Sequence, residues 1–262
     1  MAEQTSAGIA ASGPLTLAQL RAIMPHAPAS YLTHLNAAMT ASGINTPKRR
    51  AAFLAQIAVE SDELRRAREL YTTRPNYQLP GVTSRSAHTA TDANDYFNYW
   101  YGNRMGNAQP DDGYRFRGRG LIQLTGRNNY QEVGTSMGLD LVNNPDQVSN
   151  PQVSTRIAAH YFARSRGLNV VADTVNPSDD HSVRQVNRRI THAVNGGYNH
   201  VEQRLQYYRR ALEVLGAAGG AVAPQPSPTP RPSASPRPAP SATPRPTPSQ
   251  PAGPTVQRMI LG

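Results

Sequence analysis

The sequence predicts a mainly α-helical domain followed by an extended, proline-rich tail. Apolar residues recur at helical spacing in most of residues 15–216, and capping and stop residues bound several of these segments. Neither an internal repeat nor an alternation of strands with helices is visible. Cysteine is absent, so neither disulfides nor thiolate metal ligands contribute to the fold.

The first half of the domain is expected to contain three helical stretches and a loop. Residues 15–45 predict two short helices that are broken near Pro25 and stop at Gly43. Residues 45–70 begin with Thr46 as a cap and Pro47 at the first helical position, and they then predict one strong helix. Residues 72–95 are rich in turn-forming residues and predict a loop.

The second half follows the same logic. Residues 111–139 predict a glycine-rich loop, a short apolar run and a final helix. Residues 150–169 predict a helix between Pro151 and Gly167. Residues 180–216 predict two helices separated by "NGGYN".

Composition divides the chain into a flexible N-terminus (1–14), a domain (15–216) and a disordered tail (217–262). The tail contains 13 of the 23 prolines, four arginines and no acidic residue, so it is expected to be extended. The net charge of +10 favours an anionic partner, such as nucleic acid, anionic lipid or cell wall. No run approaches the roughly 20 apolar residues of a membrane span, and no secretory signal is visible.

Glu60 is the first candidate for chemistry. In "FLAQIAVES" (53–61) it shares a helix face with Phe53, Ile57 and Leu64, which predicts a buried carboxyl group with a raised pKa. Such a group suits a general acid. The alternative is a structural glutamate paired with an arginine such as Arg65 or Arg68.

A second carboxylate near Glu60 would favour a catalytic role for Glu60 over a structural one. Glu69 would lie on the opposite helix face, roughly 14 Å along the axis from Glu60, if the helix ran straight. The two can act together only if the helix ends near Arg68 and the chain then turns back. The other nearby acids, Asp62 and Glu63, are expected on the solvated surface.

The stretch "GYRFRGRGLIQLTGRNNY" (113–130) concentrates amides, hydroxyls and arginines. These groups suit sugar hydroxyls and N-acetyl groups, and an RNA-binding patch is the alternative. The aromatic residues of 96–101 are expected in the core rather than stacked on a ligand. The seven histidines show no metal-binding spacing, so neither a metal nor a cofactor is expected.

These motifs together resemble glycoside hydrolase family 19, in its endolysin-like branch. The resemblance rests on "FLAQIAVES", "RGRGLIQLTGRNNY" and "AVNGGYNHVEQR" and spans about residues 15–216. It implies a lysozyme-like, two-lobed helical fold with a substrate cleft. The sequence departs from the family at Val59, where a histidine usually precedes the acid, and at "HYF" (160–162), where many relatives have a tryptophan.

The resemblance also implies roles for individual residues. Glu60 matches the general acid, Glu69 the general base, and Thr125 the residue that helps to hold the nucleophilic water. The matching substrate-binding positions are Gln123, Asn129, Tyr130, Asn195 and Arg204.

The leading hypothesis is therefore a monomeric peptidoglycan hydrolase of the endolysin or lytic-effector type. It would cleave β-1,4 bonds by inversion and bind the anionic wall through its basic surface and tail. It would be made in the cytoplasm and reach the wall by release or by another delivery system. The alternatives are a chitinase and a non-catalytic module that binds cell wall or nucleic acid.

Overall fold

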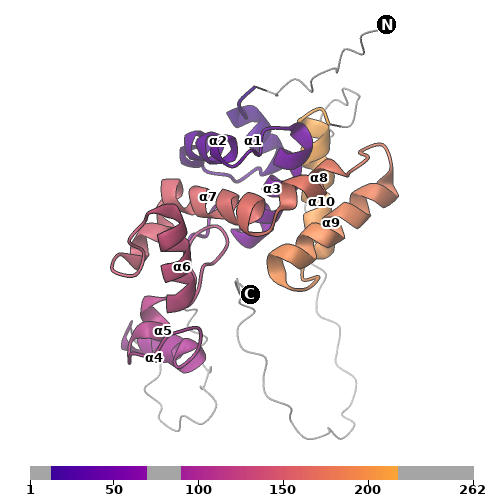
Figure 1. The fold of residues 1–262 in the computed structure, drawn as a ribbon. Helices are drawn as coiled ribbons and strands as arrows, with labels where there is room; N and C mark the ends of the chain where they lie inside the picture. The colour runs from indigo at the N-terminus through magenta and orange to yellow at the C-terminus, as the bar shows by residue number, and fades with distance from the viewer. Residues whose placement is uncertain (1–12, 70–89, 218–262) are drawn as a thin grey trace, which may run out of the picture.

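The computed structural model describes residues 13–69 and 90–217, and within these ranges the chain is mainly helical (Figure 1). The first three α-helices are α1 (Leu17–Ile23), α2 (Leu32–Ala41) and α3 (Pro47–Glu60). The central ones are α4 (Ala90–Tyr101), α5 (Asp112–Arg115), α6 (Arg127–Met137) and α7 (Pro151–His160). The last are α8 (Leu168–Asp173), α9 (Asp180–Asn195) and α10 (Val201–Val214).

Three shorter turns of other helical types complete these elements. They are η1 (Ala29–Tyr31), η2 (Pro145–Ser149) and η3 (Tyr161–Ser165), of which the last is a π-helical turn. Extended pairing among the described residues is limited to isolated bridges between Arg68 and Arg119 and between Arg119 and Leu124. The prediction of a mainly α-helical domain is confirmed.

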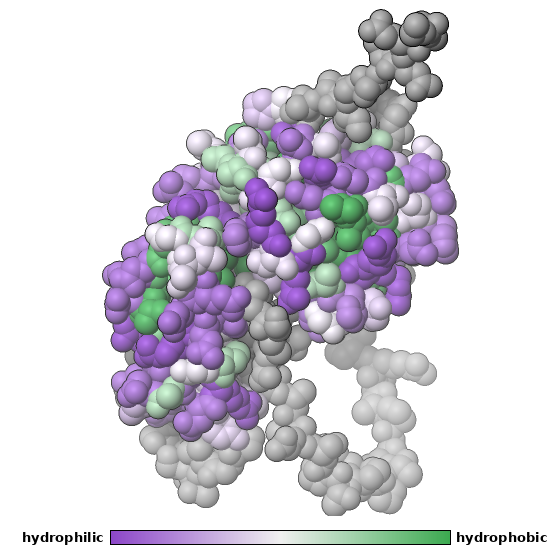
Figure 2. Space-filling view, viewed as in Figure 1, coloured by the Kyte–Doolittle hydropathy of each residue, from purple (hydrophilic) through white to green (hydrophobic). Residues whose placement is uncertain are grey.

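The helices form two groups. Helix α3 is central and packs against α8, α9 and α10, while α2 packs against α7. Helices α4 and α5 pack on each other and form a smaller group that α6 links to the rest (Figure 1). The face shown in Figure 2 is mostly hydrophilic, as expected for helices that bury one side only. No helix in the described part of the chain is long and apolar enough to span a membrane.

Local signals place most helix ends correctly. The Thr46 side chain accepts a hydrogen bond from the Arg49 amide with Pro47 in the first turn, as predicted. Asn150 caps α7 in the same way before Pro151. Between α9 and α10, the segment "NGGYN" breaks the helix as expected, and Gly196 adopts a left-handed conformation with φ 70°.

One predicted helix is too long. Helix α3 ends at Glu60 and not near residue 70, because Asp62, Glu63 and Leu64 all have left-handed backbones, with φ of 51°, 55° and 67°. The Ser61 hydroxyl donates to the Ile57 carbonyl and accepts from the Leu64 amide, which closes this turn. Leu64 is then buried with 1% of its surface exposed.

The structure tests only parts of the predicted loop (72–95) and of the predicted tail (217–262). The predicted loop at 72–95 is shorter at its end, since α4 begins at Ala90, and residues 72–89 lie outside the described ranges. Beyond α10, Leu215 and Ala217 pack against the core. The expectations for residues 1–12 and for the tail from residue 218 also lie outside the described ranges.

Candidate active site

Glu60 is the last residue of α3, and its side chain is 3% exposed. Arg204 of α10 donates from Nη2 to Glu60 Oε1 at 2.6 Å and from Nη1 to Gln56 Oε1 at 2.7 Å. Burial raises the pKa of Glu60 to about 7, and the charge and hydrogen bond of Arg204 oppose this shift without cancelling it. A substantial fraction of Glu60 is therefore protonated near neutral pH.

Arg204 is compatible with a protonated Glu60. The hydrogen bond between these side chains uses Oε1, so Oε2 can carry the proton while Oε1 still accepts from the guanidinium. Arg204 itself is fully buried, and its Nε donates to the Asn199 carbonyl at 3.3 Å. The arginine that partners Glu60 is thus neither Arg65 nor Arg68, the two proposed from the sequence.

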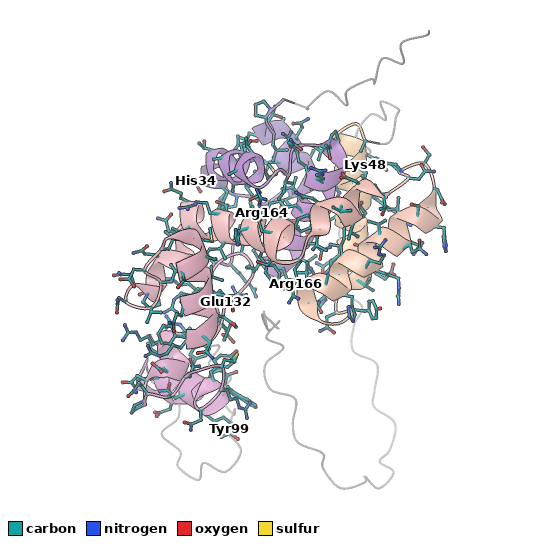
Figure 3. All side chains as sticks on the ribbon, viewed as in Figure 1. His34, Lys48, Tyr99, Glu132, Arg164 and Arg166 are labelled. Carbon is teal, nitrogen blue, oxygen red and sulfur yellow. The ribbon has the colours of Figure 1, made fainter. Side chains whose placement is uncertain are left out.

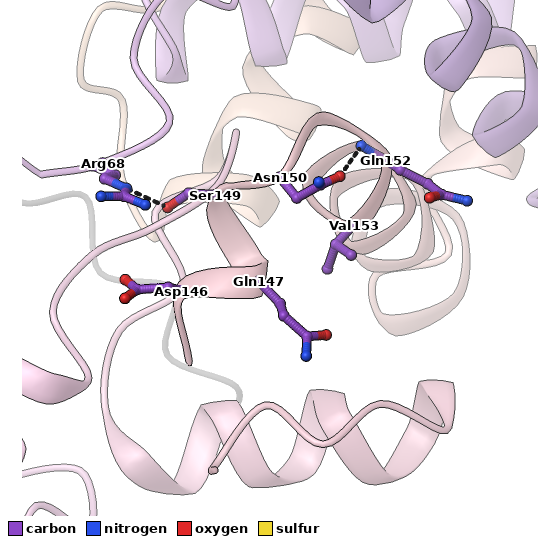
Figure 4. Close-up of a pocket in the computed structure, with 7 residues that line it drawn as sticks. All are labelled: Arg68, Asp146, Gln147, Ser149, Asn150, Gln152 and Val153. Atoms are coloured by element: carbon purple, nitrogen blue, oxygen red, sulfur yellow. Dashed lines mark hydrogen bonds between the residues drawn. The ribbon is translucent and has the colours of Figure 1, made fainter. Parts of the chain in front are cut away.

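Those two arginines have other contacts. Arg65 pairs with Asp62 at 2.9 Å, and Arg68 donates to the Ser149 hydroxyl at 3.1 Å. Arg68 lies at a polar groove of about 490 Å³ (Figure 4). The other residues that line this groove are Asp146, Gln147, Ser149, Asn150, Gln152 and Val153.

Glu69 is held by a different part of the chain. Its backbone amide donates to the Gly118 carbonyl at 2.9 Å, and the Gly118 amide returns a bond to Oε2 at 3.1 Å. The Tyr101 hydroxyl donates to Oε1 at 2.8 Å. Burial raises the pKa of Glu69, and the bonds from Tyr101 and Gly118, together with the charge of Arg117, moderate the shift.

The segment "RGRGLIQLTGRNNY" meets Glu69 at Gly118 and Gln123. A Cβ atom placed on Gly118 would lie 2.7 Å from Gln123 Oε1 and 3.0 Å from Glu69 Oε2, so both side chains flank this glycine. The buried Thr125 hydroxyl donates to the Gln123 carbonyl at 2.9 Å, and Asn129 Nδ2 donates to the Thr125 carbonyl at 2.7 Å. The chain from Gly118 to Asn129 therefore forms one hydrogen-bonded unit with Glu69.

Two predicted substrate-binding residues, Tyr130 and Arg204, are fully buried. The Tyr130 hydroxyl donates to the Arg117 carbonyl at 2.8 Å and accepts from Arg119 at 3.0 Å. Tyr130 thus supports the loop that holds Glu69, as Arg204 supports Glu60. Asn195 lies beside Arg204, and its Nδ2 donates to the Asn199 carbonyl at 3.3 Å.

The expectation for Glu63 is wrong. This residue is buried with 6% of its surface exposed, because its left-handed backbone turns the carboxylate inward. Its Oε2 accepts from the backbone amide of His26 at 2.7 Å and lies 2.8 Å from His26 Nδ1, and Oε1 accepts from the Tyr207 hydroxyl at 2.6 Å. Asp62 does lie nearer the surface, where it pairs with Arg65 and Arg66.

The aromatic residues before the site confirm the core interpretation in part. Phe97 and Tyr101 are buried and stacked with ring centroids 6.1 Å apart, whereas Tyr99 is 42% exposed. The Tyr101 hydroxyl, which bonds to Glu69, was not predicted from the sequence. Neither was Gln56, although its position four residues before Glu60 on one helix was a usable signal.

Nothing in the described ranges forms a group of three or more histidine and acidic residues suited to a metal ion. The two carboxyl groups, Glu60 and Glu69, lie on separate segments and offer acid–base chemistry. Each carboxyl group is desolvated, and each is held by its own set of donors.

Comparisons with known proteins identify the family. Residues 30–223 match glycosyl hydrolase family 19, described as chitinase class I. A glycosyl hydrolase family 19 domain-containing protein of Haemophilus influenzae is 30% identical over 203 residues, which are 72% of this chain and 92% of that protein. Acidic endochitinase Q of Nicotiana tabacum is 36% identical over 128 residues, which are 43% of this chain and 51% of that protein.

Solved structures agree on the fold. Chitinase C from Streptomyces griseus superposes with a TM-score of 0.50 at 20% identity, covering 77% of this chain and 92% of that one. This likeness concerns the fold, whereas the family assignment rests on the sequence matches. The chain is a glycoside hydrolase and belongs to glycoside hydrolase family 19.

Proposed function

We propose that the protein hydrolyses the β-1,4 bonds of peptidoglycan glycan with inversion, using Glu60 as general acid and Glu69 as general base. The observation that carries the proposal is the state of Glu60, a 3% exposed carboxyl group whose pKa is about 7. Such a group can give a proton to a glycosidic oxygen near neutral pH.

Glu69 supplies the complementary half of the reaction. Hydrogen bonds from Tyr101 and Gly118 favour its ionised form and limit the rise of its pKa. As a carboxylate it would take a proton from the attacking water on the face of the sugar opposite the leaving group. The Thr125 hydroxyl, whose proton goes to the Gln123 carbonyl, keeps its lone pairs available to accept from that water.

The substrate class is supported by charge. The net charge of +10 favours an anionic polymer over neutral chitin. The amides of Gln123, Asn129 and Asn195 offer partners for N-acetyl groups, which both polymers carry. A peptidoglycan substrate would also place the site of action at the cell wall.

Chitin is the second candidate, because several plant relatives are named endochitinases. Incubating the protein with purified peptidoglycan and with chitohexaose, followed by mass spectrometry of the products, separates the two. We expect muropeptide products with a new reducing end and an inverted anomer by NMR. Cleavage of chitohexaose with intact peptidoglycan would replace our proposal by the chitinase function.

The acid is tested in the same assay. Glu60→Gln should lower the rate roughly hundred- to ten-thousandfold, as loss of a general acid does. Glu132→Gln, an exposed glutamate on α6, is the matched control and should keep full activity (Figure 3). Full lysis by Glu60→Gln would show that another group donates the proton, and wall binding without cleavage by the unmodified protein would favour a binding module.

A further inference from the structure

Three side chains cluster where α9 ends and the chain turns toward α10. The Arg188 guanidinium lies over the ring of Tyr198, with Cζ 4.3 Å from the ring centroid. The His192 ring lies 5.4 Å from the same ring, centroid to centroid. Tyr198 is 48% exposed, and it is one of two exposed large aromatic side chains among the residues that the structure describes. The other, Tyr99, lies on the distant α4 (Figure 3).

The backbone around this cluster is tied to the proposed acid. The carbonyl of Asn199, the residue after Tyr198, accepts from both Arg204 and Asn195. Arg204 holds Glu60 directly. The preceding carbonyl of Val194 accepts from the Tyr161 hydroxyl at 3.2 Å. Tyr198 therefore projects from a loop that is fixed beside Glu60, and this separates it from an ordinary surface tyrosine.

The guanidinium of Arg188 is not paired with a carboxylate among the described residues. Its neighbour one turn earlier, Arg184, pairs with Asp180 at 2.8 Å and with Glu202 at 3.6 Å. No carboxylate in the described part of the chain pairs with Arg188. A guanidinium stacked on a ring keeps its N–H donors in its own plane, where they can bind a carboxylate in bidentate fashion.

A second polar group without a partner in the described part of the chain is the side-chain oxygen of Asn195, at the C-terminal end of α9. The Oδ1 atom of Asn195 is buried and has no hydrogen-bond partner within the described residues, although its amide nitrogen is bonded. A buried acceptor without a partner is costly unless a ligand or water supplies a donor. A sugar hydroxyl or an N-acetyl N–H is a donor of the required kind.

We propose that Arg188, Tyr198 and Asn195 form a subsite beside Glu60 for a sugar residue whose substituent carries carboxylates. In peptidoglycan this is the muramyl residue with its acidic stem peptide, so the inference rests on the proposed function and refines it. Asn195 accepts from the sugar, and Arg188, held by the Tyr198 ring, binds a stem carboxylate. Chitin could make the sugar contact with Asn195, but it has no carboxylate for Arg188 to bind.

Binding to the inactive Glu60→Gln protein tests the subsite without any need for hydrolysis. The probes are a tetrasaccharide with intact stem peptides and the same fragment with its carboxylates converted to amides, measured by calorimetry. We expect the Glu60→Gln protein to prefer the acidic fragment. Adding Arg188→Gln should reduce this preference roughly tenfold, the effect of one charge-assisted hydrogen bond.

Arg189→Gln is the matched control, because it removes the same charge from the adjacent, exposed position of α9. It should leave the preference within about twofold. Tyr198→Ala should reduce the preference as Arg188→Gln does, and Tyr198→Phe should retain it, since either ring can hold the guanidinium. Equal losses for Arg188→Gln and Arg189→Gln, or no preference in the parent protein, would overturn the subsite.

The two proposals fail differently. If the unmodified protein leaves peptidoglycan intact while Arg188 still sets the preference for the acidic fragment, the hydrolase function is wrong and the subsite stands. If peptidoglycan is cleaved and Arg188→Gln binds both fragments as the parent does, the subsite is wrong and the hydrolase function stands.

Discussion

The Glu60 carboxylate and the Arg204 guanidinium lie 2.6 Å apart, although 144 positions separate them in the sequence. Both side chains are almost completely removed from water, at 3% and 0% exposure. Desolvation disfavours the charged carboxylate more strongly than the arginine favours it, so the pKa of Glu60 rises to about 7. Arg204 thus limits the rise of this pKa, which stays close to neutral pH and suits the role of general acid that we propose for Glu60.

Glu60 should make stability fall as the pH rises. Its pKa is about 7 in the folded protein against 4.5 for an exposed glutamate, so its favourable contribution is complete below pH 4.5 and is lost as the pH rises through 7. The loss amounts to roughly 3 kcal/mol. Denaturant unfolding of the protein and of Glu60→Gln at pH 5 and pH 8 measures it. A difference between the two proteins that does not change with pH would contradict the raised pKa.

Replacing Arg204 should move the alkaline limb of the kcat/KM profile. Arg204 lowers the pKa of Glu60, so Arg204→Met should raise that pKa and shift the limb to higher pH. Arg204→Lys keeps the charge and should leave the limb closer to that of the unmodified protein. If Arg204→Met lowers kcat without moving the limb, Arg204 acts by positioning alone.

Replacing Tyr101 should move the opposite limb. The Tyr101 hydroxyl lowers the pKa of Glu69 through its 2.8 Å bond, so Tyr101→Phe should raise that pKa further. The base must be ionised, and the acid limb should therefore shift to higher pH and narrow the active range. Tyr99→Phe, at an exposed position on the same helix, is the control. Equal profiles for the two variants would argue against Glu69 as the base.

Gly118→Ala should damage activity more than stability. The new methyl group would meet Gln123 Oε1 at 2.7 Å and Glu69 Oε2 at 3.0 Å, and it must push these side chains from their positions. We expect kcat/KM to fall at least tenfold with a small change in Tm. Gly13→Ala, which meets nothing within 4 Å, is the control. Full activity of Gly118→Ala would show that neither side chain must keep its position.

Glu63 should be a stabilising residue. Its carboxylate accepts bonds from Tyr207 and His26 and holds a turn with three left-handed residues, each of which costs about 1 kcal/mol. Glu63→Ala should destabilise the protein by about 2–4 kcal/mol. Asp62→Ala, which removes only more exposed pairs, should cost at most about 1 kcal/mol.

The pH dependence of this contribution has the opposite sign to that of Glu60. Burial alone would raise the pKa of Glu63, yet the hydrogen bonds from Tyr207 and His26 bring the pKa below its ordinary value. The contribution is therefore present above about pH 4.5 and is lost at lower pH. The stability difference between Glu63→Gln and the unmodified protein should shrink on acidification, and a constant difference would contradict this.

The sequence by itself determined the helical class, most helix starts and the family. The Thr46 cap acts within one turn of its own position, so adjacent residues reveal it. The motifs around Glu60 and around residues 113–130 were sufficient to identify the family, since they are contiguous stretches.

Only the tertiary structure decided the environment of each carboxyl group. Glu60 and Glu63 lie three positions apart, yet one has a raised pKa and the other a lowered pKa. At Glu60 desolvation outweighs the guanidinium of Arg204, whereas at Glu63 the hydrogen bonds from Tyr207 and His26 outweigh desolvation. The left-handed turn that ends α3 is likewise stabilised by His26 and Tyr207. Burial and hydrogen bonding sum over neighbours that are distant in the sequence, and no local pattern specifies those neighbours.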